Sequence, residues 1–141
     1  MPNEFSKCTD PSGFDPDRGW FQITTDVASH LPFSAAVEAN GFVFVSGQAS
    51  VDAQGNIVPG SFEEQMRRAL QNVTDVLRSA GLSLENVVRV TSYVQDASDV
   101  PRFNQLYREY FTAPYPARTT ITNCLSAAIK FEIDVIAVRP T

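Results

Sequence analysis

Residues 61–81 read SFEEQMRRALQNVTDVLRSAG, and this stretch decides the kind of fold that the chain can adopt. Ser61 followed by Glu64 is a capping box, in which the hydroxyl and the carboxylate each satisfy a free backbone N–H at the start of a helix. Apolar residues then recur in steps of three and four, which predicts a helix over 61–81 that Gly81 ends. The apolar stripe consists of Phe62, Met66, Ala69, Leu70, Val73, Val76, Leu77 and Ala80.

A second helix is predicted after Asp99. Asp99 can cap its start, and Pro101 falls in the first turn, where a missing N–H costs little. The helix is expected to end before Pro114 and Pro116. Its apolar stripe consists of Phe103, Leu106, Tyr107, Tyr110 and Phe111.

Strands are predicted on both sides of these helices. Residues 41–47, GFVFVSG, form a continuous apolar run between glycines, which is typical of a buried strand. In a strand over 87–95, Val88, Val90 and Val94 are expected to alternate with polar residues. Further strands are expected at 20–23, 118–123 and 129–139.

The order of strands, helix, strand, helix and strands predicts an α+β fold with two layers. Because each helix has one apolar stripe, both are expected to pack on the same face of the sheet. Residues 1–20 are rich in proline, glycine and polar residues, which favours an extended N-terminal arm. Residues 21–141 are then expected to form a single domain.

The composition disfavours several classes of function. The net charge is −5 and basic residues are scattered, so no nucleic-acid partner is expected. No stretch approaches the ~18 consecutive apolar residues that a membrane span needs, so no membrane partner is expected. The first residues lack the basic-then-apolar layout of a secretory signal, so a cytoplasmic location is the default expectation.

The chain has few metal-binding side chains. Its cysteines are Cys8 and Cys124, and its one histidine is His30. Because a zinc site needs three or four such ligands, the chain alone is not expected to hold a metal. Catalysis with His30 as the base and a disulfide between the two cysteines are both disfavoured alternatives.

The last predicted strand carries a sign of assembly. One of its faces is wholly apolar, whereas the other is charged at one end and apolar at the other. An apolar end on an otherwise exposed sheet face predicts a contact with another subunit. The second face consists of Lys130, Glu132, Asp134, Ile136 and Val138.

Arg118 and Glu132 are the strongest candidates for chemistry. Their two strands are separated by a short loop, so they are expected to pair as a hairpin in which Arg118 faces Glu132. From spacing alone, an ordinary cross-strand ion pair is the favoured interpretation. A site is the alternative, because Arg grips a carboxylate bidentately and Glu can position or deprotonate a water.

Three further polar or glycine positions each have two interpretations. Ser46 and Gly47 end an expected strand, and a glycine there either lets a ligand approach the backbone or marks a bulge. Asn104 lies among the apolar residues of the second helix, where it either contacts a ligand or is an ordinary polar position.

These segments together resemble the RidA (YjgF) family of reactive-intermediate deaminases. The similarity covers roughly residues 30–139, in order and with few gaps. The motifs that carry it are Ser46-Gly47-Gln48, ALQNV at 69–73, VTSYV at 90–94, PART at 116–119 and KFEIDVIAVR at 130–139.

The resemblance implies a chorismate-mutase-like fold, with a mixed sheet and two helices on one face. It also implies a homotrimer with three ligand clefts between its subunits. Archetypal members hydrolyse reactive enamines and imines of amino acids, such as 2-aminoacrylate, to 2-keto acids and ammonia, without a metal or an organic cofactor. The expected ligand is therefore a small carboxylated imine, enamine or keto acid.

The resemblance also assigns site residues. The carboxylate-binding arginine of the family falls on Arg118 and its water-positioning glutamate on Glu132, and both are expected to be catalytic. Phe33 stands where the family usually has tyrosine, and Thr120 where it usually has cysteine, so these two replacements bear on the identity of the substrate. The expected substrate-binding residues are Arg118, Ser46, Gly47, Thr120, Phe33, Asn104 and Tyr115.

Two alternatives remain for the function. One is a pathway-specific deaminase of a larger enamine such as 2-aminomuconate, for which the N-terminal arm would reshape the cleft. The other is a non-catalytic metabolite-binding or interaction protein of the same fold. Some family members are described as ribonucleases, an activity that the negative net charge disfavours here.

Overall fold

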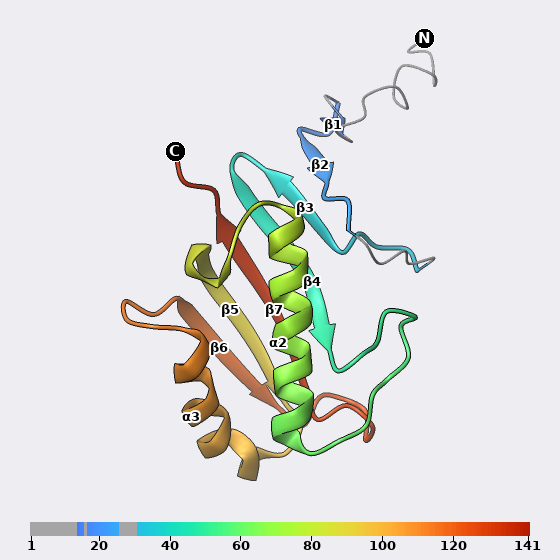
Figure 1. Cartoon of the computed structure of the whole chain (residues 1–141), viewed down its shortest axis with the longest axis vertical. Helices are drawn as coiled ribbons and strands as arrows, with labels where there is room; N and C mark the ends of the chain where they lie inside the picture. The colour runs from blue at the N-terminus through green and yellow to red at the C-terminus, as the bar shows by residue number, and fades with distance from the viewer. Residues whose placement is uncertain (1–13, 16, 26–30) are drawn as a thin grey trace.

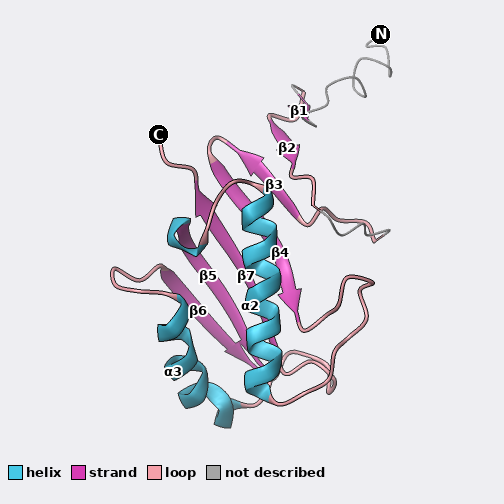
Figure 2. Ribbon diagram, viewed as in Figure 1, coloured by secondary structure: helices cyan, strands magenta, loops and turns pink. Residues whose placement is uncertain are grey.

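Seven strands form one mixed sheet in this computed structural model, which describes residues 14–15, 17–25 and 31–141. The strand order is β1-β2-β3-β4-β7-β5-β6, in which only β5 and β6 run parallel. Helices α2 and α3 lie on one face of this sheet (Figures 1 and 2), which confirms the predicted α+β fold. The elements are β1 Phe14–Asp15, β2 Trp20–Gln22, β3 Ala36–Ala39, β4 Phe42–Ala49, α2 Phe62–Ser79, the 3-10 turn η1 Leu84–Asn86, β5 Val87–Val94, the 3-10 turn η2 Ala97–Asp99, α3 Val100–Tyr110, β6 Ala117–Thr122 and β7 Phe131–Val138.

Helix α2 forms as the sequence predicts. The Ser61 hydroxyl accepts a hydrogen bond from the Glu64 N–H, and the Glu64 carboxylate accepts one from the Ser61 N–H, each at 3.1 Å. All eight predicted stripe residues are buried. Gln65 is buried as well, which the apolar pattern did not predict. Its side chain donates to the Ala128 carbonyl and accepts from the Lys130 N–H, so it fixes the chain just before β7.

Helix α3 also forms, but its start differs from the prediction. The backbone of Asp99 is already helical, and its side chain makes no capping hydrogen bond, so the predicted Asp99 cap is wrong. Asp96 instead caps the preceding 3-10 turn by accepting from the Ser98 N–H at 2.9 Å. The apolar stripe is confirmed, although Tyr110 is only partly buried.

Strands β4 and β5 are each buried on one face only. Val43 and Val45 lie in the core, whereas Phe42 and Phe44 are each 42% exposed, so the prediction of a fully buried strand is wrong for the single chain. Val88 is exposed because the register with β7 shifts between Val87 and Arg89. A bulge of this kind transfers the following side chains to the other face of a sheet.

The predicted hairpin of the last two strands is wrong. Strand β6 pairs in parallel with β5 at one edge of the sheet, and β7 lies between β4 and β5. The residue types explain this arrangement, because the apolar β7 suits a central place, whereas the threonine-rich β6 tolerates the exposure of an edge. Arg118 and Glu132 therefore do not face each other across a strand pair.

The two faces of the sheet differ in their surroundings. The face that α2 and α3 cover, called here the closed face, supplies the apolar core, in which Phe131, Ile133 and Val135 of β7 are buried. The Phe131 ring contacts Phe62 of α2 and Phe103 of α3. The other face, called here the open face, is uncovered in the single chain. In the described ranges, no helix is both long and apolar enough to cross a membrane.

The N-terminal segment extends the sheet at the edge opposite β6. Strand β2 pairs with β3, and the short β1 pairs with β2. Most of the predicted arm lies outside the described residues, so its division from a domain over 21–141 stays a prediction. Cys8 and His30 also lie outside them, and Cys124 is an exposed free thiol.

Candidate active site

Arg118 is held in place by side chains of α3. Its Nη2 donates a hydrogen bond to Asn104 Oδ1 at 2.8 Å. The guanidinium carbon lies 4.8 Å from the ring centroid of Phe103 and 4.7 Å from that of Tyr107, which are cation–π distances. Because a guanidinium carries five N–H donors, donors remain to grip a carboxylate.

A hollow of about 250 Å³ surrounds this guanidinium, and we call it the Arg118 half-site. It brings together three of the predicted binding residues, Arg118, Asn104 and Tyr115. Burial raises the pKa of Tyr107 above its ordinary value, against a partial lowering by Arg118. The lining consists of Asn104, Tyr107, Arg108, Tyr115, Pro116 and Arg118.

Thr120 shares the strand face of Arg118, two residues further along β6. Its Oγ1 is buried and has no hydrogen-bond partner within the described part of the chain. A buried hydroxyl left unpaired costs free energy, so this atom needs a partner that the described residues of the single chain do not supply. Thr120 does not line the hollow of the Arg118 half-site described above, so its role in binding stays a prediction.

Glu132 lies on the open face, directly against Gly47 of β4. A Cβ built on Gly47 would stand 3.2 Å from Glu132 Cδ, so glycine is what allows this approach. The β4–β7 register also shifts between Val45 and Gln48. The bulge interpretation of Gly47 is therefore confirmed, whereas the approach of a ligand to its backbone stays a prediction.

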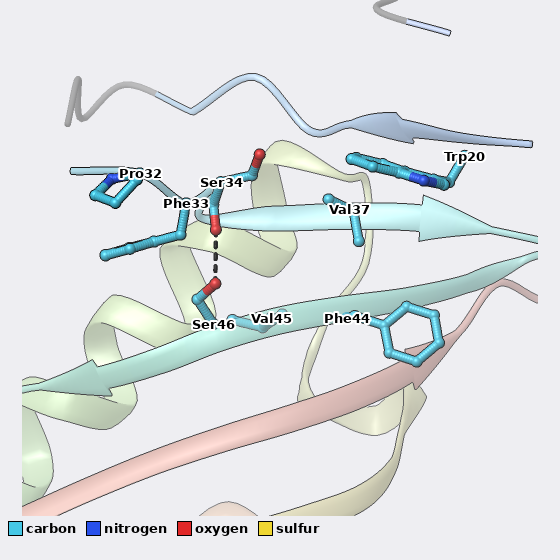
Figure 3. A pocket seen from close by; sticks show the side chains of 8 residues that line it. All are labelled: Trp20, Pro32, Phe33, Ser34, Val37, Phe44, Val45 and Ser46. Carbon is cyan, nitrogen blue, oxygen red and sulfur yellow. Dashed lines mark hydrogen bonds between the residues drawn. The ribbon is translucent and has the colours of Figure 1, made fainter. Parts of the chain in front are cut away.

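Ser46, the chain neighbour of Gly47, and Phe33 line a second hollow of about 590 Å³, whose lining does not include Gly47 or Glu132. The Ser46 hydroxyl donates to the Ser34 carbonyl at 2.6 Å, as Figure 3 shows. Glu132, Gly47, Ser46 and Phe33 form what we call the Glu132 half-site. The lining of the hollow consists of Trp20, Pro32, Phe33, Ser34, Val37, Phe44, Val45 and Ser46.

The electrostatic surroundings of Glu132 favour its protonated form. Among the described residues, the Glu132 carboxylate makes no hydrogen bond and no ion pair. Burial raises its pKa, and the neighbouring charge of Asp134 raises it further. A carboxylate of raised pKa is a stronger base, which suits proton transfer to and from a water.

The two half-sites lie on opposite sides of the sheet within one chain. Arg118 contacts α3 on the closed side. Glu132 alternates with Phe131 and Ile133, which belong to the core, so it points to the open side. The prediction that Arg118 faces Glu132 on one side of the sheet is therefore wrong for a single chain. The described residues also contain no group of three His, Cys, Asp or Glu side chains that could hold a metal ion.

These features define a class of small α+β proteins in which one mixed sheet carries two separate polar half-sites. The family model for endoribonuclease L-PSP matches residues 24–139, which is most of the chain. The chain therefore belongs to this family, also called the YjgF/RidA family, and the predicted resemblance is confirmed.

Three relatives illustrate the similarity. The mitochondrial protein mmf2 of Schizosaccharomyces pombe is 42% identical over 110 residues, which cover 75% of this chain and 86% of that protein. The 2-iminobutanoate/2-iminopropanoate deaminase of Bos taurus is 36% identical over 110 residues, with coverages of 77% and 80%. The crystal structure of E. coli TdcF with bound serine matches with a TM-score of 0.75 and 32% identity, covering 84% of this chain and 98% of TdcF.

Proposed function

We propose that this protein hydrolyses small imines or enamines that carry a carboxylate, releasing a 2-keto acid and ammonia. The observation that carries the proposal is the pair of complementary half-sites, a fixed guanidinium with free donors and an unpaired carboxylate of raised pKa. Two relatives support it by their names, since one is an iminobutanoate deaminase and the other was solved with serine, which has an α-carboxylate.

The complete site in this proposal lies between protomers of a homotrimer. Since the two half-sites are separated within one chain, Arg118 of one protomer has to meet Glu132 of another. The open face supports such an assembly, because it presents apolar side chains that are costly to leave in water. Phe42, Phe44, Val88 and Ile121 are each 40–42% exposed in the single chain.

The reaction then needs only positioning and proton transfer. An enamine first tautomerises to the imine, whose carbon is electrophilic. Arg118 holds the carboxylate and so fixes that carbon. The imine binds protonated on nitrogen, as an iminium ion. Glu132 takes a proton from water as the C–O bond forms, which gives a neutral carbinolamine. Glu132 then gives this proton to the amino nitrogen and takes the hydroxyl proton as the C–N bond breaks and C=O forms, so that ammonia leaves and Glu132 finally releases the proton to solvent.

The hollow beside Ser46 bears on the size of the substrate. At about 590 Å³ it has room for a substituent larger than a methyl group, which favours the larger-enamine alternative. Its lining is largely apolar, and the described residues that form it include no Lys or Arg. We therefore expect apolar substituents to be accepted better than the second carboxylate of 2-aminomuconate. A series of imines with increasing apolar side chains, compared with 2-aminomuconate, tests this expectation.

Subunit mixing tests the proposed function and the shared site together. Arg118→Ala and Glu132→Gln are each expected to abolish most hydrolysis of 2-iminopropanoate. After unfolding and joint refolding of the two variants, an interface that combines the intact Arg118 with the intact Glu132 is complete. In a random trimer this restores about a quarter of the wild-type activity. Mixing without refolding is the control, and no restoration after refolding would overturn a site between protomers.

The non-catalytic alternative makes a different prediction for Glu132→Gln. A binding protein keeps its affinity for a keto acid in this variant and shows no turnover in the wild type.

We also propose a cytoplasmic location, although the name of the S. pombe relative places that protein in mitochondria. Cell fractionation with a tagged chain tests the location.

A further inference from the structure

Two polar side chains beside Glu132 are not used by the mechanism above. Tyr93 of β5 is the direct register partner of Glu132 of β7. Asp134 lies two residues beyond Glu132 on the same strand, and therefore on the same open face. Tyr93 Oη donates a hydrogen bond to Asp134 Oδ2 at 2.9 Å, so the three side chains form one cluster.

The hydrogen bond holds the Asp134 carboxylate in a fixed place. Burial and the Asp134 carboxylate together raise the pKa of Tyr93 to about 12, so the phenol stays neutral and keeps donating at any physiological pH. Asp134 is itself partly buried. A charge fixed in a partly buried place acts more strongly on its neighbours than a mobile charge in solvent.

The other charged groups near this cluster are turned away from Glu132. On β4, the neighbours of Glu132 are Gly47, Gln48 and Ala49, which do not titrate. Directly before β7, Lys130 Nζ donates to the Gly60 carbonyl at 2.6 Å. On β5, Arg89 Nη2 donates to Thr119 at 2.6 Å, toward β6. The Cys124 thiol acts on Tyr93 from the loop before β7. Within the described residues, Asp134 is thus the charge that acts on Glu132.

We propose that Tyr93 and Asp134 are positioning residues for Glu132, in which the tyrosine anchors a second carboxylate whose charge makes Glu132 a stronger proton acceptor. This inference rests on the proposed function and adds to it. Glu132 still takes the proton from water and passes it to the leaving amine. Asp134 exchanges no proton, and it acts only through its charge. This role gives a reason for placing Glu132, which has no cationic partner among the described residues, beside another acid.

The pH profile of kcat/KM tests this role. Glu132 must be deprotonated to accept the proton of water, so activity falls as the pH drops through its pKa. Asp134 raises that pKa, hence Asp134→Asn is expected to move the acid limb to lower pH by about half a pH unit or more. The same variant is expected to lower the rate on the plateau severalfold, because Glu132 becomes a weaker base.

Tyr93→Phe is the second variant, and it removes only the anchoring oxygen. The acid limb is expected to move in the same direction by a smaller amount, because Asp134 is then free to turn toward solvent. Asp134→Glu keeps the negative charge, so the acid limb of its pH profile is expected to lie close to that of the wild type. Asp75→Asn on the exposed side of α2 is the matched control, and the acid limb of its pH profile is expected to stay at the wild-type pH.

A direct titration separates this inference from the proposed function. Carboxyl ¹³C NMR follows the pKa of Glu132 without any turnover, with Glu132→Gln used to assign its signal. A Glu132 pKa that is the same in the wild type and in both Asp134→Asn and Tyr93→Phe overturns the positioning role, even if the enzyme is active. A lowered pKa in a protein that hydrolyses no imine supports the coupling and overturns the proposed function alone.

Discussion

The two half-sites of this protein are built in opposite ways. Arg118 is paired within its own chain, by a hydrogen bond to Asn104 and by two aromatic rings beneath it. Glu132 has no such partner among the described residues and lies beside a second acid. The Arg118 side chain is thus held in place without a ligand, whereas the Glu132 carboxylate has no positive charge beside it among the described residues. This difference fits the proposed function, in which a substrate and a neighbouring protomer complete the site.

The largest effect is expected from removing the Arg118 guanidinium. Arg118→Ala is expected to lower kcat/KM for 2-iminopropanoate by about a hundredfold or more, mostly through KM, because the carboxylate loses its bidentate partner. Arg118→Lys is expected to recover only part of the loss, since an ammonium lacks the planar fork. Arg68→Ala on the exposed side of α2 is the matched control. Undiminished hydrolysis by Arg118→Ala would show that the mechanism is wrong.

Removing the Glu132 carboxylate is expected to change kcat, whereas removing Arg118 changes mainly KM. Glu132→Gln keeps the shape of the side chain and deletes its basicity, so kcat is expected to fall by about a hundredfold with KM changed by no more than a few-fold. Steady-state kinetics on the same substrate measure both constants. If the loss appears in KM instead, Glu132 binds the substrate and does not transfer protons.

A smaller effect is expected from the close approach of Gly47 to Glu132. Gly47→Ala places a Cβ 3.2 Å from Glu132 Cδ, so the carboxylate has to move by a few tenths of an ångström. We expect about a tenfold fall in kcat, because a small displacement of a catalytic group is costly. Gly60→Ala is the matched control, since its Cβ would lie equally close to Glu64, away from both half-sites. Equal losses in the two variants would point to a general effect on folding.

The smallest effect is expected for the hydrogen bond that orients Arg118. Asn104→Ala removes that bond and leaves the two rings in place. KM is expected to rise by about three- to tenfold, the worth of one ordinary hydrogen bond, because Asn104 orients Arg118 and the rings still hold the guanidinium. Gln105→Ala, at the next and exposed position of α3, is the control. A KM unchanged by Asn104→Ala would mean that the aromatic rings alone hold the guanidinium.

Local features of the fold were predictable because they depend on neighbouring residues. The capping box of α2 and the apolar stripes of both helices involve contacts within a few residues, and the structure confirms them. The family resemblance also follows from short motifs in a fixed order. By contrast, the predicted Asp99 cap is wrong because the 3-10 turn before α3 already makes the Asp99 backbone helical.

The sequence by itself determined the α+β class, the helices and the residue types of the two half-sites. Only the tertiary structure decided that β7 inserts between β4 and β5, and hence that Arg118 and Glu132 lie on opposite sides of the sheet. The physical reason is that strand pairing joins residues far apart in sequence. The alternation of side chains along a strand predicts which of them share a face of the sheet. It does not predict which strand lies beside it, or where a bulge moves the following side chains to the other face.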